Sequence, residues 1–281
     1  MSNRIITAEQ MACFRNYLRE EERSAATQEK YLRDVRCFAA WLMGAPVCKE
    51  RVAQWKAFLI ETGYCPETVN GKLTALDRFF HFLGWEDSNV KHLKLQRKLF
   101  REESRELTKA EYEHLLTAAR ERGQERLTLL METICSTGIR VSELKYITCE
   151  AADRGKAELS LKGKIRTILL PRKLCRKLIK YAKKHNIASG EIFLTRSGRS
   201  LSRKQIWAEM KRLCRQAGVA PSKAFPHNLR HLFARTFYRA CRDVAKLADV
   251  LGHSSIETTR IYLISTGAEH ARTLEQLRLI S

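Results

Sequence analysis

Apolar residues recur at three- and four-residue steps through the first 98 residues, the spacing that predicts amphipathic helices. One such stripe runs through Tyr31, Val35 and Phe38. Glycine and proline separate the apolar stretches, and Thr7 with Gln10 gives a capping-box signature at the start of the first stretch. Short helices joined by brief loops predict a small helical bundle. The predicted helices lie at about 7–22, 27–43, 50–62 and 67–84.

Six aromatic residues of this bundle have two interpretations, as a hydrophobic core or as a stacking surface for nucleic-acid bases. The core is favoured, since helical spacing alone predicts a buried stripe. Basic side chains on the same helices are better candidates for DNA contact, although charges on helices are usually just solvated. The aromatic residues are Trp41, Trp55, Phe79, Phe80, Phe82 and Trp85, and the basic ones are Lys72, Arg78, Arg33 and Arg36.

The helical pattern ends between residues 88 and 106, where charge is dense and no apolar period is sustained. Such a stretch is typical of a linker, and a linker this basic can also follow a phosphate backbone. A new capping-box signature, Thr108 with Glu111, follows at once. We therefore expect a domain boundary near Arg105. The predicted parts are a helical DNA-binding domain at 1–98, a linker at 99–106 and a second domain at 107–281.

The second domain is predicted to be mainly helical with one small antiparallel sheet. A helix that ends at Gly138 is expected to restart at Arg140. Short alternating arms around Gly163 predict a β-hairpin. Further helices are expected at about 171–185 and, from a capping box at its start, 202–216.

Charge narrows the choice of partner. The chain has 281 residues, enough for two domains with a core each, and a formal net charge of +21. Residues 1–100 contribute +4 of that charge and residues 101–281 contribute +17. A folded protein with this excess of cations is expected to bind a polyanion.

Cysteine usage and hydropathy indicate the cellular compartment in which the protein is expected. The nine cysteines are scattered and form no C-x-x-C pair, which favours reduced thiols in a cytoplasmic protein over a zinc site or a disulfide framework. No apolar run approaches the roughly 20 residues of a membrane span, and the first ten residues have no signal-peptide core. We expect a cytoplasmic protein that does not contact a membrane.

Reactive side chains gather in the strongly basic part of the chain. His227 and Arg230 form an H-x-x-R pair. His253 stands in a Leu-Gly-His turn, and Tyr262 follows nine residues later. Guanidinium, imidazole and phenol groups can position a phosphodiester, neutralise its charge and manage protons without a metal ion. Arg140 and Arg230, each at a predicted helix start, can fork onto the non-bridging oxygens of one phosphate.

Two further groups complete this chemistry. A lysine on the hairpin, Lys162 or Lys164, suits protonation of a departing 5′ oxygen, which is otherwise a poor leaving group. A tyrosine can attack phosphorus and store the bond energy as a phosphotyrosine ester. Each residue alone has a structural interpretation as a packed ring, a helix cap or an ion pair. A structural account of all six would need six separate coincidences, so the chemical interpretation is preferred.

These residues occur in motifs that resemble those of tyrosine recombinases of the phage-integrase and Xer type. The resemblance spans the whole chain, keeps the family's order, and includes the 23-residue step from Arg230 to His253. Any single motif would carry little weight, whereas the set is specific. The motifs are T-G-I-R-V-S-E-L at 137–144, the lysine hairpin, P-H-N-L-R-H at 226–231, L-G-H-S at 251–254 and T-R-I-Y at 259–262.

The resemblance implies a role for each reactive position. Lys162 is preferred to Lys164 as the general acid, because the family's lysine also precedes the turn glycine, although the hairpin here is shorter than the family's. Glu143 matches an acidic position that orients the first arginine. His231 is expected to be structural, and a place beside the site is the alternative. The other implied roles are phosphate clamp for Arg140 and Arg230, proton acceptor and donor for His227, phosphate hydrogen bond for His253 and nucleophile for Tyr262.

The resemblance also implies an assembly. A SAM-like core-binding domain and a catalytic domain would close as a clamp on double-stranded DNA that carries paired inverted-repeat sites. Four protomers, with or without accessory proteins, would exchange strands through 3′-phosphotyrosine intermediates and a Holliday junction, without ATP, metal or cofactor. A tail helix at 268–279 is expected to dock into a neighbouring protomer, and capping of its own domain is the alternative.

Several functions fit this chemistry. Integration or excision of a mobile element is preferred to Xer-type chromosome-dimer resolution, because the hairpin departs from the housekeeping pattern. A type IB topoisomerase shares the tyrosine chemistry, but the compact helical bundle and the tail favour a recombinase. A DNA-binding module that has lost its chemistry is disfavoured, because every reactive position is filled.

Overall fold

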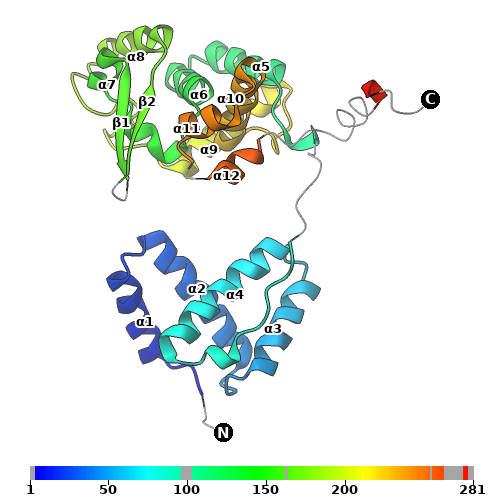
Figure 1. Cartoon of the computed structure of the whole chain (residues 1–281). Helices are drawn as coiled ribbons and strands as arrows, with labels where there is room; N and C mark the ends of the chain where they lie inside the picture. Colours follow the sequence, from blue (N-terminus) through cyan, green and yellow to red (C-terminus); the bar gives the residue numbers. More distant parts are fainter. Residues whose placement is uncertain (1–3, 96–102, 162–163, 254, 263–274, 278–281) are drawn as a thin grey trace. The chain divides into compact units, whose positions relative to one another are not determined.

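The computed structural model describes residues 4–95, 103–161, 164–253, 255–262 and 275–277. Within these ranges the chain is mainly helical with one two-stranded antiparallel sheet (Figure 1), which confirms the predicted fold class. Contacts divide the chain into two compact units, residues 1–97 and 98–281, each with its own hydrophobic core. The predicted limits of the two domains and of the linker stay a prediction.

The first unit contains four α-helices, whose starts follow the sequence signals. At α1 the predicted capping box forms: Thr7 Oγ1 accepts from the N–H of Gln10, whose side chain accepts from the N–H of Thr7. Pro66 occupies the first turn of α4, where its missing N–H costs nothing. The elements are α1 (Ala8–Glu20), α2 (Ala25–Leu42), α3 (Lys49–Glu61), α4 (Pro66–Leu83) and the 3-10 turn η1 (Glu86–Ser88).

The aromatic stripe lies in the core of this unit. Trp55, Phe79 and Phe80 are fully buried, and the rings of Phe38 and Trp55 pack with centroids 5.0 Å apart. Trp41, Phe82 and Trp85 pack against the same core while staying partly exposed. The core interpretation is therefore confirmed for the three buried rings.

A buried carboxylate ties two helices of the first unit together. Asp34 on α2 pairs with Lys30 Nζ at 2.9 Å and with Lys72 Nζ of α4 at 3.6 Å. Lys30 also donates to the backbone oxygen of Gly71 in α4. The Lys72 side chain is only 12% exposed, so this lysine, one of the candidates for DNA contact, neutralises an internal charge.

The second unit adds eight α-helices, two 3-10 turns and one hairpin within the described residues. Both further capping boxes form, Thr108 with Glu111 at α5 and Ser202 with Gln205 at α9. The elements are η2 (Glu103–Arg105), α5 (Lys109–Glu121), α6 (Glu125–Thr137), η3 (Val141–Tyr146), α7 (Cys149–Arg154), β1 (Lys156–Leu161), β2 (Lys164–Leu169), α8 (Arg172–Lys184), α9 (Arg203–Ala217), α10 (Pro226–Cys241), α11 (Val244–Leu251) and α12 (Ile256–Arg260).

Helix α6 is the centre of this unit. It packs against α5, α8, α9 and α10, and Leu130, Met131 and Ile134 are fully buried (Figure 1). A helix that is apolar on most of its faces is stable only when other elements surround it. This packing fixes the carboxyl end of α6 beside the first turns of α10, where the reactive residues meet.

The hairpin presents one apolar face. In its antiparallel register Leu159 lies opposite Arg166. Leu159 and Ile168 are buried, whereas Leu169, the residue after Ile168, is 76% exposed, as the two-residue period of a strand requires. The predicted turn residues Lys162 and Gly163 lie outside the described residues.

One predicted element was wrong in type. The α-helix expected to restart at Arg140 is the six-residue 3-10 turn η3. The Glu143 carboxylate accepts the backbone N–H of Arg140 at 2.8 Å, and the backbone N–H of Glu143 bonds to the Arg140 carbonyl. Such 3-10 turns serve as short connectors. Here the connector fixes Arg140 and Glu143 relative to each other.

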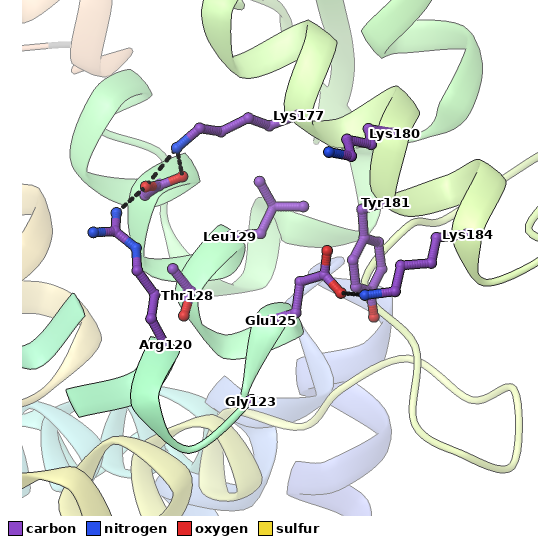
Figure 2. Close-up of a pocket in the computed structure, with 10 residues that line it drawn as sticks. Arg120, Gly123, Glu125, Thr128, Leu129, Lys177, Lys180, Tyr181 and Lys184 are labelled. Carbon is purple, nitrogen blue, oxygen red and sulfur yellow. Dashed lines mark hydrogen bonds and ion pairs between the residues drawn. The ribbon is translucent and has the colours of Figure 1, made fainter. Parts of the chain in front are cut away.

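A surface cavity of about 440 Å³ lies among α5, α6 and α8 (Figure 2). Ion pairs bridge its rim: Glu132 accepts from Arg120 and Lys177, and Glu125 accepts from Lys184. Exposed pairs of this kind contribute about 0–1 kcal/mol each to stability. None of the predicted reactive residues lines this cavity.

Candidate active site

Arg230 is the central residue of the candidate site. It lies one turn into α10, which Pro226 opens, and it is 1% exposed. Its guanidinium donates to the carbonyl oxygen of Gly138, to the carbonyl oxygen of Leu251 at 3.0 Å and to the ring of His253 at 2.9 Å. Groups of the protein therefore occupy most donors of this buried cation.

Two glycines make these carbonyls available. Gly138 closes α6 and Gly252 closes α11, both in the left-handed conformation, with φ of +66° and +64°. A Cβ on Gly138 would lie 2.3 Å from a ring carbon of Phe233, so a side chain would displace α10 or the turn. The two helix ends therefore approach Arg230 closely enough for their last carbonyls to accept from it.

Arg140 differs from Arg230 in exposure. Its side chain is 44% exposed and bonds to Glu143 Oε1 at 2.9 Å. Glu143 is almost fully buried and also accepts from Arg166 of β2, at 3.1 Å to Oε1 and 3.0 Å to Oε2. A buried carboxylate between two guanidinium groups holds both of them in place. This arrangement agrees with the orienting role expected for Glu143.

His253 lies between Arg230 and α12. Its Nε2 is 2.9 Å from the Arg230 guanidinium, and its Nδ1 is 2.8 Å from Oγ1 of the fully buried Thr259. Because arginine can only donate, Nε2 must be the acceptor and Nδ1 must carry the proton. These two contacts thus fix one neutral tautomer of His253.

Electrostatics keeps both catalytic-motif histidines neutral. Burial, together with the positive charges of Arg230, Arg140 and Arg166, lowers the pKa of His253 to about 4. Burial and the first two arginines also lower the pKa of His227. A neutral imidazole can accept a proton, as the role expected for His227 requires.

The pKa of His253 predicts a pH dependence of stability. An unfolded histidine titrates near 6.5, so between about pH 6.5 and 4 the unfolded chain binds a proton that the folded ring does not. The free energy of unfolding should therefore fall by about 2 kcal/mol as the pH falls through this window. Urea unfolding of wild type and His253→Gln at several pH values measures it. Any contribution of His227 is common to both proteins. If the free energy of unfolding fell equally with pH in both, the lowered pKa assigned to His253 would be wrong.

Tyr262 is placed against the buried arginine and is itself only 4% exposed. Arg230 Nε donates to its hydroxyl oxygen at 3.4 Å. The His253 ring stacks on it with centroids 5.8 Å apart, and the His231 ring meets it edge-on at 4.6 Å. The His227 ring lies further away, with a centroid distance of 6.4 Å. His231, expected to be structural, is the histidine ring that lies nearest to Tyr262 among these three.

The structure thus brings six of the seven predicted site residues to one place. The exception is Lys162, which lies outside the described residues, so the choice between Lys162 and Lys164 stays a prediction. The clamp role of the two arginines stays a prediction: Arg140 is accessible, whereas Arg230 is buried and bonded to the protein. The six residues are Arg140, Glu143, His227, Arg230, His253 and Tyr262.

Sequence reasoning missed two residues of the site, Arg166 and Thr259. Both carried a usable signal. Arg166 shares the inward face of β2 with Ile168, and Thr259 precedes Tyr262 by three residues on the same helical face. A charged or polar side chain on an otherwise buried face is worth singling out.

Within the described residues, no group of three or more His, Cys, Asp and Glu side chains is arranged to hold a metal ion. No helix in those ranges is long and apolar enough to cross a membrane.

Comparison with protein families decides the classification. The model of the phage integrase family matches residues 105–269, more than half of the chain, and the phage integrase N-terminal SAM-like domain matches residues 12–87. The chain belongs to the phage integrase family. As a member of that family it is a tyrosine-type site-specific recombinase, which confirms the resemblance drawn from its motifs.

Individual relatives of the chain agree with the family. The tyrosine recombinase XerA of Thermococcus kodakarensis is 29% identical over 273 residues, covering 94% of this chain and 93% of the relative. The tyrosine recombinase XerD of Brucella suis biovar 1 is 31% identical over 273 residues, covering 86% and 88%. A lambda integrase tetramer bound to a Holliday junction is similar in fold, with a TM-score of 0.71, 20% identity and coverage of 90% of this chain and 76% of that one.

Proposed function

We propose that the integrase cuts one DNA strand at a time by attack of Tyr262 on a backbone phosphate. The observation that carries this proposal is the position of the Tyr262 hydroxyl, 3.4 Å from the guanidinium of Arg230 on a different helix. A nucleophile and a charge-neutralising cation that are neighbours can act on the same phosphorus.

In the proposed step one bond to phosphorus forms as another breaks. The Tyr262 oxygen forms a bond to phosphorus while the bond to the 5′ oxygen breaks, which leaves a 3′-phosphotyrosine and a free 5′ hydroxyl. A neutral histidine, His227 by its motif, takes the tyrosine proton, and Lys162 supplies a proton to the 5′ oxygen. Attack by a 5′ hydroxyl reverses the step. Because the ester keeps the bond energy, no ATP is consumed.

The two arginines of the proposed phosphate clamp, Arg140 and Arg230, have to exchange hydrogen-bond acceptors during this step. Arg140 is exposed and is the first guanidinium that a phosphate can reach. Arg230 must exchange a carbonyl or the His253 ring for a phosphate oxygen. His253 must then donate from Nε2, which the added negative charge favours because it offsets the repulsion from the arginines. Binding of DNA would thus convert a closed set of bonds into an active one.

The assembly is proposed from relatives. We propose that four protomers hold two duplexes with paired inverted-repeat sites and exchange strands through a Holliday junction, by analogy with the lambda integrase tetramer bound to such a junction. The matches include XerA and XerD as well as an integrase, so they support recombination without favouring one biological role. Integration or excision of a mobile element is our preferred role, on the basis of the shortened hairpin. A cytoplasmic location is supported by nine free cysteines.

A nicked suicide duplex tests the proposed function. The DNA flanking the gene should contain inverted repeats around a short spacer, and a duplex of that sequence nicked close to the cut site loses its 5′ fragment after cleavage. We expect a covalent protein–DNA adduct that survives denaturing electrophoresis. A plasmid without the repeats is the control, and relaxation of that plasmid would instead support a topoisomerase. Absence of the adduct with folded protein that binds the repeats would overturn the proposal.

A further inference from the structure

Arg166 is a cation in an apolar position. It projects from the inward face of β2, opposite Leu159 and two residues before the buried Ile168, and its side chain is 14% exposed. Burial in this environment, with Arg230 and Arg140 nearby, lowers the pKa of its guanidinium. An apolar residue in this position would avoid the desolvation cost, so the charge calls for an explanation.

One side of Arg166 holds the first clamp arginine indirectly. Its Nη1 donates to both oxygens of Glu143, and the same carboxylate accepts from the side chain and the backbone N–H of Arg140. Glu143 therefore serves two arginines, one buried and one accessible. A shift of Arg166 would move Glu143 and, with it, the guanidinium of Arg140.

The other side of Arg166 holds the turn that carries His253. Its Nη2 donates to the carbonyl oxygen of Val250 at 2.7 Å. A Cβ on Gly252 would lie 2.3 Å from Arg166 Cδ and 2.5 Å from its Nε, so the side chain lies flat against this glycine. That contact explains why no described group accepts a hydrogen bond from the buried Nε.

We propose that Arg166 is a positioning residue that keeps Arg140 and His253 in register, so that both reach the same phosphate. It spans β2, η3 and the end of α11, three elements that are distant in sequence, and it links the Glu143 carboxylate to the turn with a single planar group. The neighbouring carbonyl, that of Leu251, is held by Arg230. The inference rests on the proposed function, because it concerns how the site meets DNA.

A neutral substrate separates positioning from simple destabilisation. In a methylphosphonate duplex, a methyl group replaces one non-bridging oxygen, so the site has less charge to neutralise. Arg166→Gln should slow cleavage of the ordinary phosphodiester by about 10- to 100-fold, the range for groups that orient a functional residue. On the methylphosphonate the loss should be less than about threefold, because a displaced Arg140 then matters little. Arg166→Lys, which can reach only one of the two acceptors at a time, should fall between wild type and Arg166→Gln.

Two comparisons sharpen this test. Arg154 lies on the exposed end of α7 and bonds within its own helix, so Arg154→Gln should change neither rate. Glu143→Gln combined with Arg166→Gln should be little slower than the slower single variant, since both act on Arg140 through one carboxylate. If Arg166→Gln lost the same fraction of its cleavage rate on the phosphodiester and on the methylphosphonate, and that fraction equalled the unfolded fraction of the protein, the proposal would be overturned.

A measurement without DNA keeps this inference apart from the proposed function. The ring nitrogens of His253, followed by NMR in the DNA-free protein, should show one fixed neutral tautomer in wild type and a mixture in Arg166→Gln. Unchanged ring signals would overturn the role of Arg166, whatever the adduct assay gives. A wild-type protein that forms no adduct but shows the ring change would instead overturn the proposed chemistry and leave Arg166 as the holder of the turn.

Discussion

Tyr262→Phe should abolish the covalent protein–DNA adduct and leave binding to the repeats unchanged. Only the hydroxyl is lost, and in the proposed reaction that oxygen is the atom that joins phosphorus. Deleting a nucleophile costs at least about 10⁴-fold in rate where a residual reaction can be measured at all. The adduct on the suicide duplex and the dissociation constant for an uncut duplex give the two measurements.

Stability should hardly change in this variant. The hydroxyl accepts one long bond from Arg230, so its loss should cost about 1 kcal/mol, and the buried ring keeps its contacts with Ala234, Leu247 and Leu251. Tyr238→Phe, on the same small cluster, is a matched control that should retain the adduct. An adduct with Tyr262→Phe, or its loss with Tyr238→Phe, would refute the assignment of the nucleophile.

The burial of Tyr262 has a dynamic consequence. The proposed nucleophile is packed away from solvent, yet in the proposed reaction it must reach a phosphate. Among the described residues, the apolar cluster that holds it contains three other buried residues, far fewer than the main core of the second unit. A small cluster costs little to open, since stability varies across a structure with the local density of buried contacts. Release of α12 is therefore compatible with an intact catalytic unit.

Local rules were enough to predict most of the helices. The capping boxes at Thr7, Thr108 and Ser202 each start a helix where the sequence predicts one, because a side chain three residues away satisfies the first free N–H groups. The type of η3 was not predictable in this way. Its geometry depends on Glu143, and Glu143 is placed by Arg166 from a strand distant in sequence.

The sequence predicted which residues form the site, but not which of them are open to substrate. Motifs and their order name Arg140, His227, Arg230, His253 and Tyr262, since each type of side chain has a chemical reason to be there. Motifs give no sign of backbone acceptors, however, so the bonds from Arg230 to the carbonyls of Gly138 and Leu251 appear only in three dimensions. Whether an arginine is open to substrate or closed on the protein is a property of packing.

Arg230→Lys should lower the rate of adduct formation by about 10²- to 10³-fold, the loss expected when one donor to a developing oxyanion is removed. Lysine keeps the charge, but its single ammonium group cannot hold the remaining protein acceptors and a phosphate oxygen at the same time. A buried carbonyl left without a donor costs about 1–3 kcal/mol, so the free energy of unfolding should also fall by about that amount. Rates must therefore be measured on protein shown to be folded, for example by its binding to the uncut duplex.

Arg140→Lys gives the comparison that separates chemistry from stability. Arg140 is exposed and pairs only through Glu143 among the described residues, so its replacement should change stability by less than about 1 kcal/mol. The rate should nevertheless fall about as far as in Arg230→Lys, because lysine cannot fork onto two phosphate oxygens. If Arg140→Lys cleaved like wild type while Arg230→Lys lost activity only in proportion to its unfolded fraction, the two arginines would not form a phosphate clamp. If the two arginines share one phosphate, both variants should lose cleavage. Only Arg230→Lys should also lose stability, because Arg230 is the buried member of the pair.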